Sequence, residues 1–381
     1  MDWLTGGHAG EAKRLVKQLA DPAKCEGAAR SLIQLGADSM PALIDALGTN
    51  DSFLRDNATR TLVQIGPLAV SPLCQALTSA HPEIRGRAAE VLGIIKDKNA
   101  VPVLLDALHG EFFTVRAKAA LALGQIRDVQ AIPALTDALK DKEASVRAAA
   151  SIGLGKFSDP RTFEAISNVL LDDPQIEVRQ AAAKALGETR RTEAIPYLMD
   201  ALQDSFWWFE REQQVNDLLD AIASMGEAVV PELIEALRDP EGTVRRFAGQ
   251  LLSRIPDERA IEPLTLSLYD THPDVCKASA EALASIGTPA LPVLLDALHH
   301  PEAWIRQQAA IGLTKSRDPQ VVPALLNLIN DENRDVRKQI VHSLADMRDL
   351  RALPALQELA ATRTDREMAA LAKQAVQAIQ A

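Results

Sequence analysis

Proline recurs at a nearly constant interval along the 381-residue chain, and this periodicity constrains the fold more than any other feature. The intervals are 29 to 32 residues, except for one of 35 residues and one repeat in which Glu164 stands at the expected position. Self-similarity of this period is typical of solenoids, in which each repeat is one supersecondary unit packed on its neighbours. The prolines in register are Pro41, Pro72, Pro102, Pro133, Pro196, Pro231, Pro263, Pro292, Pro323 and Pro354.

A second marker keeps the same spacing: a β-branched residue or leucine followed by an arginine. Cysteine replaces the base in two repeats, at Cys25 and Cys276. An alanine-rich segment follows the base, as in VRAKAALALGQI at 115–126. The bases in register are Arg55, Arg85, Arg116, Arg147, Arg179, Arg245, Arg306 and Arg337.

Each repeat is predicted to be a pair of helices. The first, as in AIPALTDAL at 131–139, has proline in its opening turn, where the amide has no intrahelical partner, and an apolar stripe at i, i+3 and i+4. An aspartate in the turn caps the second helix, whose alanines let neighbouring helices approach closely and whose glycine is expected to end it. We expect about twelve pairs between Glu11 and Ile379, forming an all-α solenoid wound into a curved superhelix.

The chain is predicted to be one solenoid over residues 1–381. Its expected parts are an N-terminal capping helix pair at 1–37, regular repeats at 38–204, an irregular segment with a lengthened second helix at 205–226, regular repeats at 227–350 and a C-terminal capping pair at 351–381.

These phrases resemble HEAT repeats, and in particular the short HEAT-like type named for phycobilisome lyases. The clearest matches are DKEASVRAAASIGLGK at 141–156, AIPALTDAL at 131–139 and residues 331–337. The resemblance covers the whole chain, but such repeats serve scaffolds, lyases and regulators alike. It also implies that the bases of the series are structural, each linked to an aspartate of a neighbouring repeat in a ladder along the stack.

The overall charge and the cysteines narrow the classes of function. A net charge of −11 and a pI near 5.2 disfavour nucleic acid as the main partner. The three cysteines have no paired spacing, which is typical of reduced thiols, and no apolar run approaches the roughly 18 residues of a membrane span. We therefore expect a cytoplasmic protein without a membrane span.

No catalytic or nucleotide-binding motif is present in the sequence. The chain lacks the His-Glu pairs of the HEAT-repeat deoxyhypusine hydroxylases, and its acidity disfavours the HEAT-like DNA glycosylases. Five histidines fall in turns, where they are interpreted as polar turn residues and not as ligands, so we expect no metal and no cofactor. These are His81, His109, His272, His299 and His300.

The longest interval contains the consecutive aromatics Phe206, Trp207, Trp208 and Phe209, followed by Arg211. Four additional residues equal about one helical turn, so the second helix can lengthen without rotating its apolar face. Four adjacent side chains cannot all point inward, and at least one of Trp207, Trp208 and Phe209 is expected to be exposed. Exposed aromatics are common interface anchors. Aromatics at corresponding places elsewhere are Phe53, Phe112, Phe113 and Trp304.

Three hypotheses of function follow. The first is a non-enzymatic scaffold that binds a partner protein through its concave surface and the aromatic turn at 206–209. The alternative, implied by the resemblance, is a phycobilin lyase or isomerase, in which the aromatics would stack on a tetrapyrrole and Cys25 or Cys276 could carry it. The third is a homodimer closed through the exposed aromatics.

Overall fold

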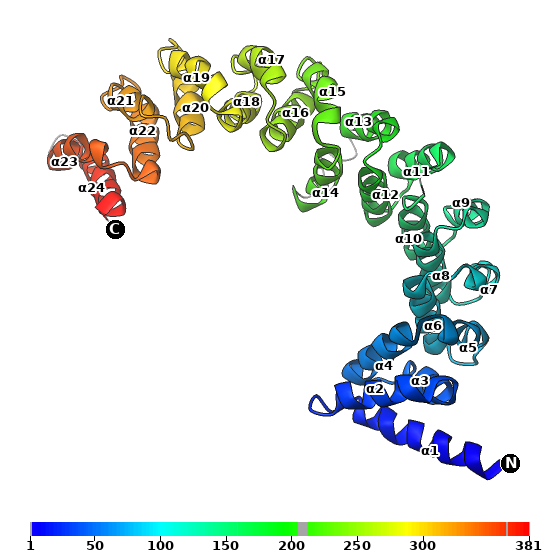
Figure 1. Ribbon diagram of the computed structural model, residues 1–381. Coiled ribbons are helices and arrows are strands. Elements are labelled where there is room, and N and C mark those ends of the chain that lie inside the picture. Colours follow the sequence, from blue (N-terminus) through cyan, green and yellow to red (C-terminus); the bar gives the residue numbers. More distant parts are fainter. Residues whose placement is uncertain (1, 158, 205–211, 363–364, 381) are drawn as a thin grey trace. The chain divides into compact units, whose positions relative to one another are not determined.

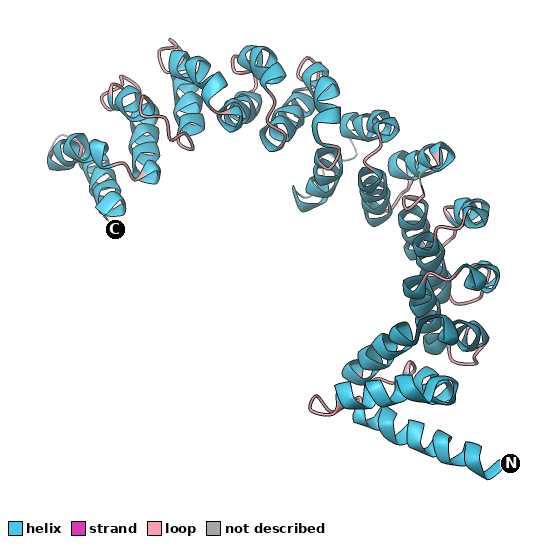
Figure 2. Cartoon of the chain, in the orientation of Figure 1, coloured by secondary structure: helices cyan, strands magenta, loops and turns pink. Residues whose placement is uncertain are grey.

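The computed structural model describes residues 2–157, 159–204, 212–362 and 365–380. Within these ranges the chain is built of helices joined by short turns, and no strand is present (Figure 2). The chain divides into two compact units, one of residues 1–201 with 211–221 and one of residues 202–210 with 222–381. The prediction of an all-α solenoid of helix pairs is confirmed.

The first unit contains the helices α1 to α12 (Figure 1). They are α1 (Asp2–Gln18), α2 (Cys25–Leu35), α3 (Met40–Ala46), α4 (Ser52–Ile65), α5 (Val70–Ala76), α6 (Pro82–Ile95), α7 (Val101–Ala107), α8 (Phe113–Ile126), α9 (Ile132–Ala138), α10 (Ala144–Leu154), α11 (Pro160–Asp172) and α12 (Ile176–Thr189). In this unit the second helices α4, α6, α8, α10 and α12 form one layer, and the first helices α3, α5, α7, α9 and α11 form the other.

The second unit repeats this arrangement (Figure 1). The second helices α16, α18, α20, α22 and α24 form one layer, and the first helices α15, α17, α19, α21 and α23 form the other. Its helices are α15 (Val230–Ala236), α16 (Gly242–Arg254), α17 (Ile261–Ser267), α18 (Pro273–Ile286), α19 (Leu291–Ala297), α20 (Ala303–Leu313), α21 (Val321–Leu326), α22 (Arg334–Met347), α23 (Leu353–Ala361) and α24 (Arg366–Gln380). The helices α13 (Ile195–Gln203) and α14 (Glu212–Ala223) have residues in both units.

In most repeats one turn of 3₁₀ helix leads into the first helix, and the proline lies in the opening turn that follows. Pro41 in α3, Pro102 in α7 and Pro133 in α9 occupy the first or second position of seven-residue helices. Proline is favoured there because its missing N–H would have no intrahelical acceptor. The 3₁₀ turns are η1 (Gly36–Ser39), η2 (Gly66–Ala69), η3 (Lys98–Ala100), η4 (Val129–Ala131), η5 (Thr192–Ala194), η7 (Gly226–Val229), η8 (Glu258–Ala260), η9 (Thr288–Ala290) and η10 (Leu350–Ala352).

Helix α11 explains why Glu164 interrupts the series of prolines. This helix starts directly at Pro160, without a 3₁₀ turn, and runs for 13 residues. The Asp159 side chain accepts a hydrogen bond from the Arg161 backbone N–H and caps the helix. Phe163 is fully buried in place of a smaller aliphatic side chain. The proline is therefore moved to the start of a longer helix and is not lost.

The expectation that a glycine ends the second helix holds for α2, α4, α10 and α18, whose C-caps are Gly36, Gly66, Gly155 and Gly287, but not for α8. Gly124 lies within α8, and a Cβ placed on it would come within 2.4 Å of the Gly153 Cα in α10. The two backbones can approach this closely only because neither residue has a side chain. Helix α8 ends at Arg127, which adopts the left-handed conformation. Gly124 is therefore a packing residue that sets the distance between α8 and α10.

Candidate functional site

Arginine side chains at the start of the second helices connect successive repeats. In the first unit the Arg116 Nε and Nη2 atoms donate to the Asp141 carboxylate at 2.7 and 2.9 Å. The Arg116 Nη1 atom donates to the carbonyl oxygens of Gly110 and Glu111 at 3.0 and 2.9 Å, in the turn before its own helix. One guanidinium thus fastens its own turn and the turn of the next repeat, using the two-pronged geometry that arginine provides.

The same arrangement occurs at three further repeats. Each base makes two hydrogen bonds to one carboxylate, with donor–acceptor distances of 2.6 to 3.0 Å, and the side chains of both partners are largely buried. The pairs are Arg147 with Asp173 in the first unit, and Arg245 with Asp270 and Arg306 with Asp331 in the second. We call these three pairs, together with Arg116–Asp141, the arginine ladder.

Each aspartate of the ladder also caps a turn. The Asp141 carboxylate accepts a hydrogen bond from the Glu143 backbone N–H, and the Asp270 carboxylate accepts one from that of His272. Hydrogen bonds from the Arg116 guanidinium lower the pKa of the Asp141 carboxyl. Burial raises the pKa of Asp270, but hydrogen bonds from Arg245 and from His272 outweigh it and lower that pKa to about 2. These carboxylates are therefore ionised at neutral pH.

The remaining bases of the predicted series are held by backbone carbonyls to different degrees. The Arg337 Nη1 atom donates to the Asp331 and Glu332 carbonyl oxygens, and the Arg179 Nε atom donates to the Asp173 carbonyl oxygen. The Arg55 Nη1 atom donates to the Thr49 carbonyl oxygen. Arg85 differs most from the paired bases of the arginine ladder, because its guanidinium makes no hydrogen bond within the described residues.

The reason lies in the turn that each base meets. The aspartate of a ladder pair stands six residues before the base of the following repeat, as Asp141 stands before Arg147. At the corresponding positions after Arg55 and Arg85 the chain has Ser79 and Gly110, which carry no carboxylate. The Nε atoms of Arg55 and Arg85 are accordingly buried without a hydrogen-bond partner among the described residues.

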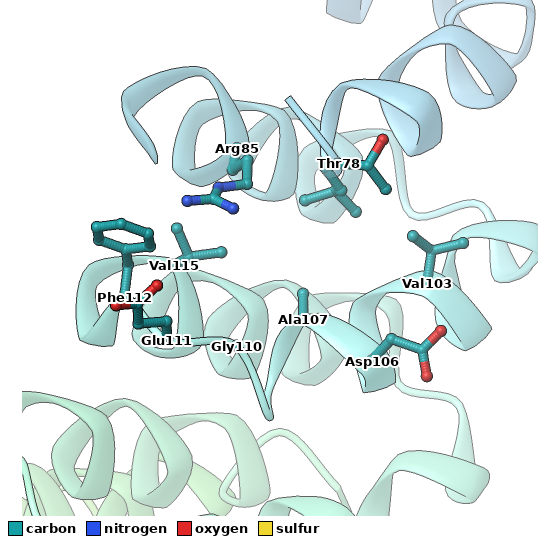
Figure 3. A pocket seen from close by; sticks show the side chains of 10 residues that line it. Thr78, Arg85, Val103, Asp106, Ala107, Gly110, Glu111, Phe112 and Val115 are labelled. Atoms are coloured by element: carbon teal, nitrogen blue, oxygen red, sulfur yellow. The ribbon is translucent and has the colours of Figure 1, made fainter. Parts of the chain in front are cut away.

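A pocket of about 390 Å³ lies beside Arg85 (Figure 3). The Arg85 guanidinium carbon lies 4.6 Å from the centroid of the Phe112 ring, within cation–π range. In Figure 3 these two side chains lie at one end of the pocket, and Asp106 and Val103 lie at the other. The pocket is lined by Leu77, Thr78, Arg85, Val103, Asp106, Ala107, Gly110, Glu111, Phe112 and Val115.

The predicted aromatic site residues that the structure describes lie at the N-terminal ends of second helices. Phe112 is the N-cap of α8 and Phe113 is its first residue, and their side chains are 39% and 47% exposed. Phe53, near the start of α4, is 42% exposed. Trp304, in α20, is half-buried. The predicted residues Phe206, Trp207, Trp208, Phe209 and Arg211 lie outside the described residues.

The histidines and cysteines occupy turn and core positions. His81 and His272 are the N-caps of α6 and α18. Among the described residues no cluster of three His, Cys, Asp or Glu side chains is placed to hold a metal ion. Cys276 is completely buried, and its Sγ donates to the carbonyl oxygens of Asp270 and His272 at 3.1 and 3.2 Å. No helix in the described part of the chain has the length and apolarity that a membrane crossing requires.

The paired helices, their packing glycines and the arginine ladder define an α-solenoid. Comparison with known families identifies its type: the profile of HEAT repeats matches residues 68–151, 138–215, 230–311 and 291–377, which together cover more than half of the chain. The chain therefore belongs to the HEAT-repeat family.

One relative comes from the cyanobacterial phycocyanin operon. The chain is 26% identical over 175 residues to the "Uncharacterized phycocyanin operon protein Z" of Pseudanabaena tenuis, a match that covers 43% of this chain and 84% of that protein. This relation agrees with the resemblance to HEAT-like repeats of the phycobilisome-lyase type.

Solved structures of similar fold include karyopherins. Kap121p bound to the extreme C-terminus of the protein phosphatase Cdc14p matches with a TM-score of 0.58 and 14% identity, over 97% of this chain and 49% of that one. Kap95p, in a structure with RanGDP, matches with a TM-score of 0.54 and 13% identity, over 97% of this chain and 59% of that one. The chain thus spans about half the length of these proteins, and the likeness concerns the fold alone.

Sequence reasoning did not find the Arg85 pocket. The sequence does contain an indication of the pocket, which is a missing aspartate. Gly110 stands where later repeats have Asp141 or Asp173, while Arg85 is retained. The consequence of that omission depends on which side chains surround the guanidinium, and the three-dimensional arrangement supplies this information.

Proposed function

We propose that the chain is a non-enzymatic scaffold that binds a partner protein through the surface of its second helices and the aromatic side chains at their N-terminal ends. The observation that carries the proposal is the exposure of Phe53 near the start of α4 and of Phe112 and Phe113 at the start of α8, two repeats further along the chain. Large aromatic side chains exposed on one edge are the usual anchors of protein interfaces, because each buries much area at a small loss of side-chain entropy. An α-solenoid presents such an edge over many repeats.

The test is capture of a partner by the full chain from an extract of its native host, with the partner identified by mass spectrometry and then purified. The double variant Phe53→Ala/Phe113→Ala is expected to weaken binding of the purified partner by roughly tenfold or more, since anchor residues contribute most of an interface's free energy. The double variant Trp207→Ala/Trp208→Ala tests in the same way whether the sequence-based prediction for that turn holds.

The matched control is Leu68→Ala, which removes a side chain that is 70% exposed in η2, away from the N-terminal ends of the second helices. Helical circular dichroism should be the same for all variants. If both aromatic variants bind the purified partner as tightly as the unmodified chain and the Leu68 variant do, the aromatic edge is not the interface.

A second candidate function, handling of a phycobilin chromophore, is favoured by the relation to a phycocyanin operon protein. The role of a carrier thiol finds no support at Cys276, because this thiol is buried and burial raises its pKa to about 12. The discriminating measurement is incubation with phycocyanobilin and a phycobiliprotein apo-subunit. Visible absorbance retained by either protein after gel filtration would favour this function, and its absence would leave the scaffold.

A further inference from the structure

Base and carboxylate are present or absent together at most rungs of the ladder. Most turns that carry an aspartate six residues before the next base meet an arginine of the preceding repeat, as in Arg116–Asp141 and Arg306–Asp331. Where the following turn carries His300, the base itself is replaced by Cys276. A buried guanidinium without a carboxylate is unfavourable, because its charge is desolvated without compensation. Retention of an arginine opposite a turn that has no carboxylate at the ladder position therefore calls for a separate explanation.

Arg85 is the base for which that explanation is most needed. Arg55 also meets a turn without a carboxylate, but it donates to the Thr49 carbonyl oxygen of its own turn. The Arg85 guanidinium makes no such bond within the described residues, and its Nε atom is buried. The guanidinium also lies over the face of Phe112, and this contact leaves the Nη N–H groups at the edge of the guanidinium plane available.

The pocket beside Arg85 is formed where the next rung of the ladder would be. Gly110 follows Arg85 by the same number of residues as Asp141 follows Arg116, so the missing carboxylate would project from Gly110. Gly110 lines the pocket together with the apolar side chains of Leu77 and Val115 and the ring of Phe112 (Figure 3). The guanidinium therefore lies at one end of a space with apolar walls, which the carboxylates of Asp106 and Glu111 also line.

We propose that this pocket binds a carboxylate group from another molecule, which takes the position that an aspartate occupies at the later rungs of the ladder. A guanidinium holds a carboxylate by two parallel hydrogen bonds, and apolar walls strengthen that interaction. Asp106 and Glu111 also line the pocket, and their charges disfavour a second negative charge on the ligand, which selects a carboxylate over a phosphate. The origin of this carboxylate rests on the proposed function: the group belongs to an acidic side chain or to the C-terminus of the partner protein.

The test uses small carboxylates, so it does not require the partner. Acetate is titrated into the ¹⁵N-labelled full chain while the arginine Nε–H resonances are recorded, and the Arg85 signal is identified as the one that disappears in Arg85→Lys. We expect this signal to shift saturably, with a dissociation constant on the order of 1 mM for a single charged pair. Inorganic phosphate, titrated in parallel at equal ionic strength, should shift it less.

Gly110→Asp is the decisive variant. It supplies a carboxylate from the chain itself, and a Cβ at this position meets only the Ala107 carbonyl oxygen within 4 Å, at 3.2 Å. Because the tethered group has a high effective concentration, acetate binding should weaken roughly tenfold or more. Arg87→Gln is the matched control, because it also makes the net charge more negative by one and lies in α6, as Arg85 does. Arg87 pairs with Glu90 and does not line the pocket, so the acetate shift at Arg85 should persist in this variant.

Two blocked compounds separate the sources of the carboxylate. N-acetyl-glutamate with an amidated C-terminus presents only the side-chain group, and N-acetyl-glycyl-leucine presents only the terminal group. If one of the two compounds binds more tightly than the other, the result supports a carboxylate site in the pocket and shows whether the side-chain or the terminal carboxylate is preferred. A titration in which the Arg85 signal does not shift with any carboxylate, or shifts equally in Gly110→Asp, would overturn the inference while leaving the scaffold proposal intact.

Discussion

Cys276 shows how a single position of the ladder adapts when its partner is missing. In the preceding repeat the base is Arg245, and at this position the thiol takes over only the bonds to the turn, donating to the Asp270 and His272 carbonyl oxygens. Burial raises the pKa of this thiol to about 12. Only the thiolate is an effective nucleophile, so this cysteine should be inert at neutral pH.

We predict that Cys276 resists alkylation in the folded protein. Treatment with a maleimide at pH 7, followed by peptide mapping, should modify Cys25, which is partly exposed, and leave Cys276 unmodified. In 6 M guanidinium chloride both should react, which serves as the control. Modification of Cys276 at the rate of Cys25 without denaturant would contradict the burial described above.

At the scale of the helices, the contact between α8 and α10 depends on two glycines. A Cβ on Gly124 would come within 2.4 Å of the Gly153 Cα and within 2.7 Å of its carbonyl oxygen. These are backbone atoms, so no side chain can rotate to relieve the contact. Substitution must push the two helices apart and disturb the packing around them.

We therefore predict that Gly124→Ala lowers the free energy of unfolding by about 1–3 kcal/mol, the usual effect of overpacking. The control is Gly27→Ala in α2, where nothing lies within 4 Å of the added Cβ. That change should raise the free energy of unfolding by up to about 1 kcal/mol, through helix propensity alone. Urea denaturation followed by circular dichroism measures both, and equal effects in the two variants would show that close helix approach is not limiting.

At the scale of the whole molecule, the ladder pairs are repeated contributions to stability, because repeat proteins are stabilised by the sum of nearest-neighbour interfaces. The aspartates of these pairs are Asp141, Asp173, Asp270 and Asp331. Burial raises the pKa of each carboxyl, but hydrogen bonds from its arginine and from backbone N–H groups outweigh burial and lower the pKa. A carboxyl whose pKa is lower in the folded state stabilises that state fully only above its unfolded pKa, near 4. The contribution disappears as the pH falls through the folded value.

We predict that the free energy of unfolding decreases steeply between about pH 4 and pH 2. The contribution of Asp270, whose folded pKa is about 2, amounts to roughly 2 kcal/mol of this loss. Urea titrations at pH 5, 4, 3 and 2 measure the decrease. The Asp270→Asn variant should have a lower free energy of unfolding at pH 5 and should lose less of it on acidification. An identical pH profile for the variant and the unmodified chain would exclude the Asp270 carboxylate as a source of the pH dependence.

Most of the fold could be predicted from the sequence because its determinants are local. The spacing of Pro41, Pro102 and Pro133 marks the first helices, and the arginine with its alanine-rich segment marks the second. Each helix pair packs mainly on its neighbours, so a repeated phrase implies a repeated structure. Where a repeat changes its phrase, the local pattern is less informative: α11 begins at Pro160, although Glu164 stands at the position of the periodic proline.

The candidate site was less predictable, since it depends on distances between repeats. The exposure of Phe53 is decided by how α4 meets its neighbours, and the packing role of Gly124 by its approach to Gly153. The pairing of Arg116 and the lack of a carboxylate at Arg85 result from the residue that the next turn places opposite each guanidinium. Such information is present in the sequence but can be interpreted only once the repeats are stacked.

The sequence by itself determined that this protein is a stack of helix pairs, because hydrophobic periodicity, proline position and alanine content act within one repeat. Only the tertiary structure decided which charges are satisfied, which aromatic side chains remain exposed and where a pocket forms beside Arg85. The physical reason is that burial and electrostatic compensation are properties of neighbouring repeats together, and a guanidinium is stable or available according to what the next turn offers it.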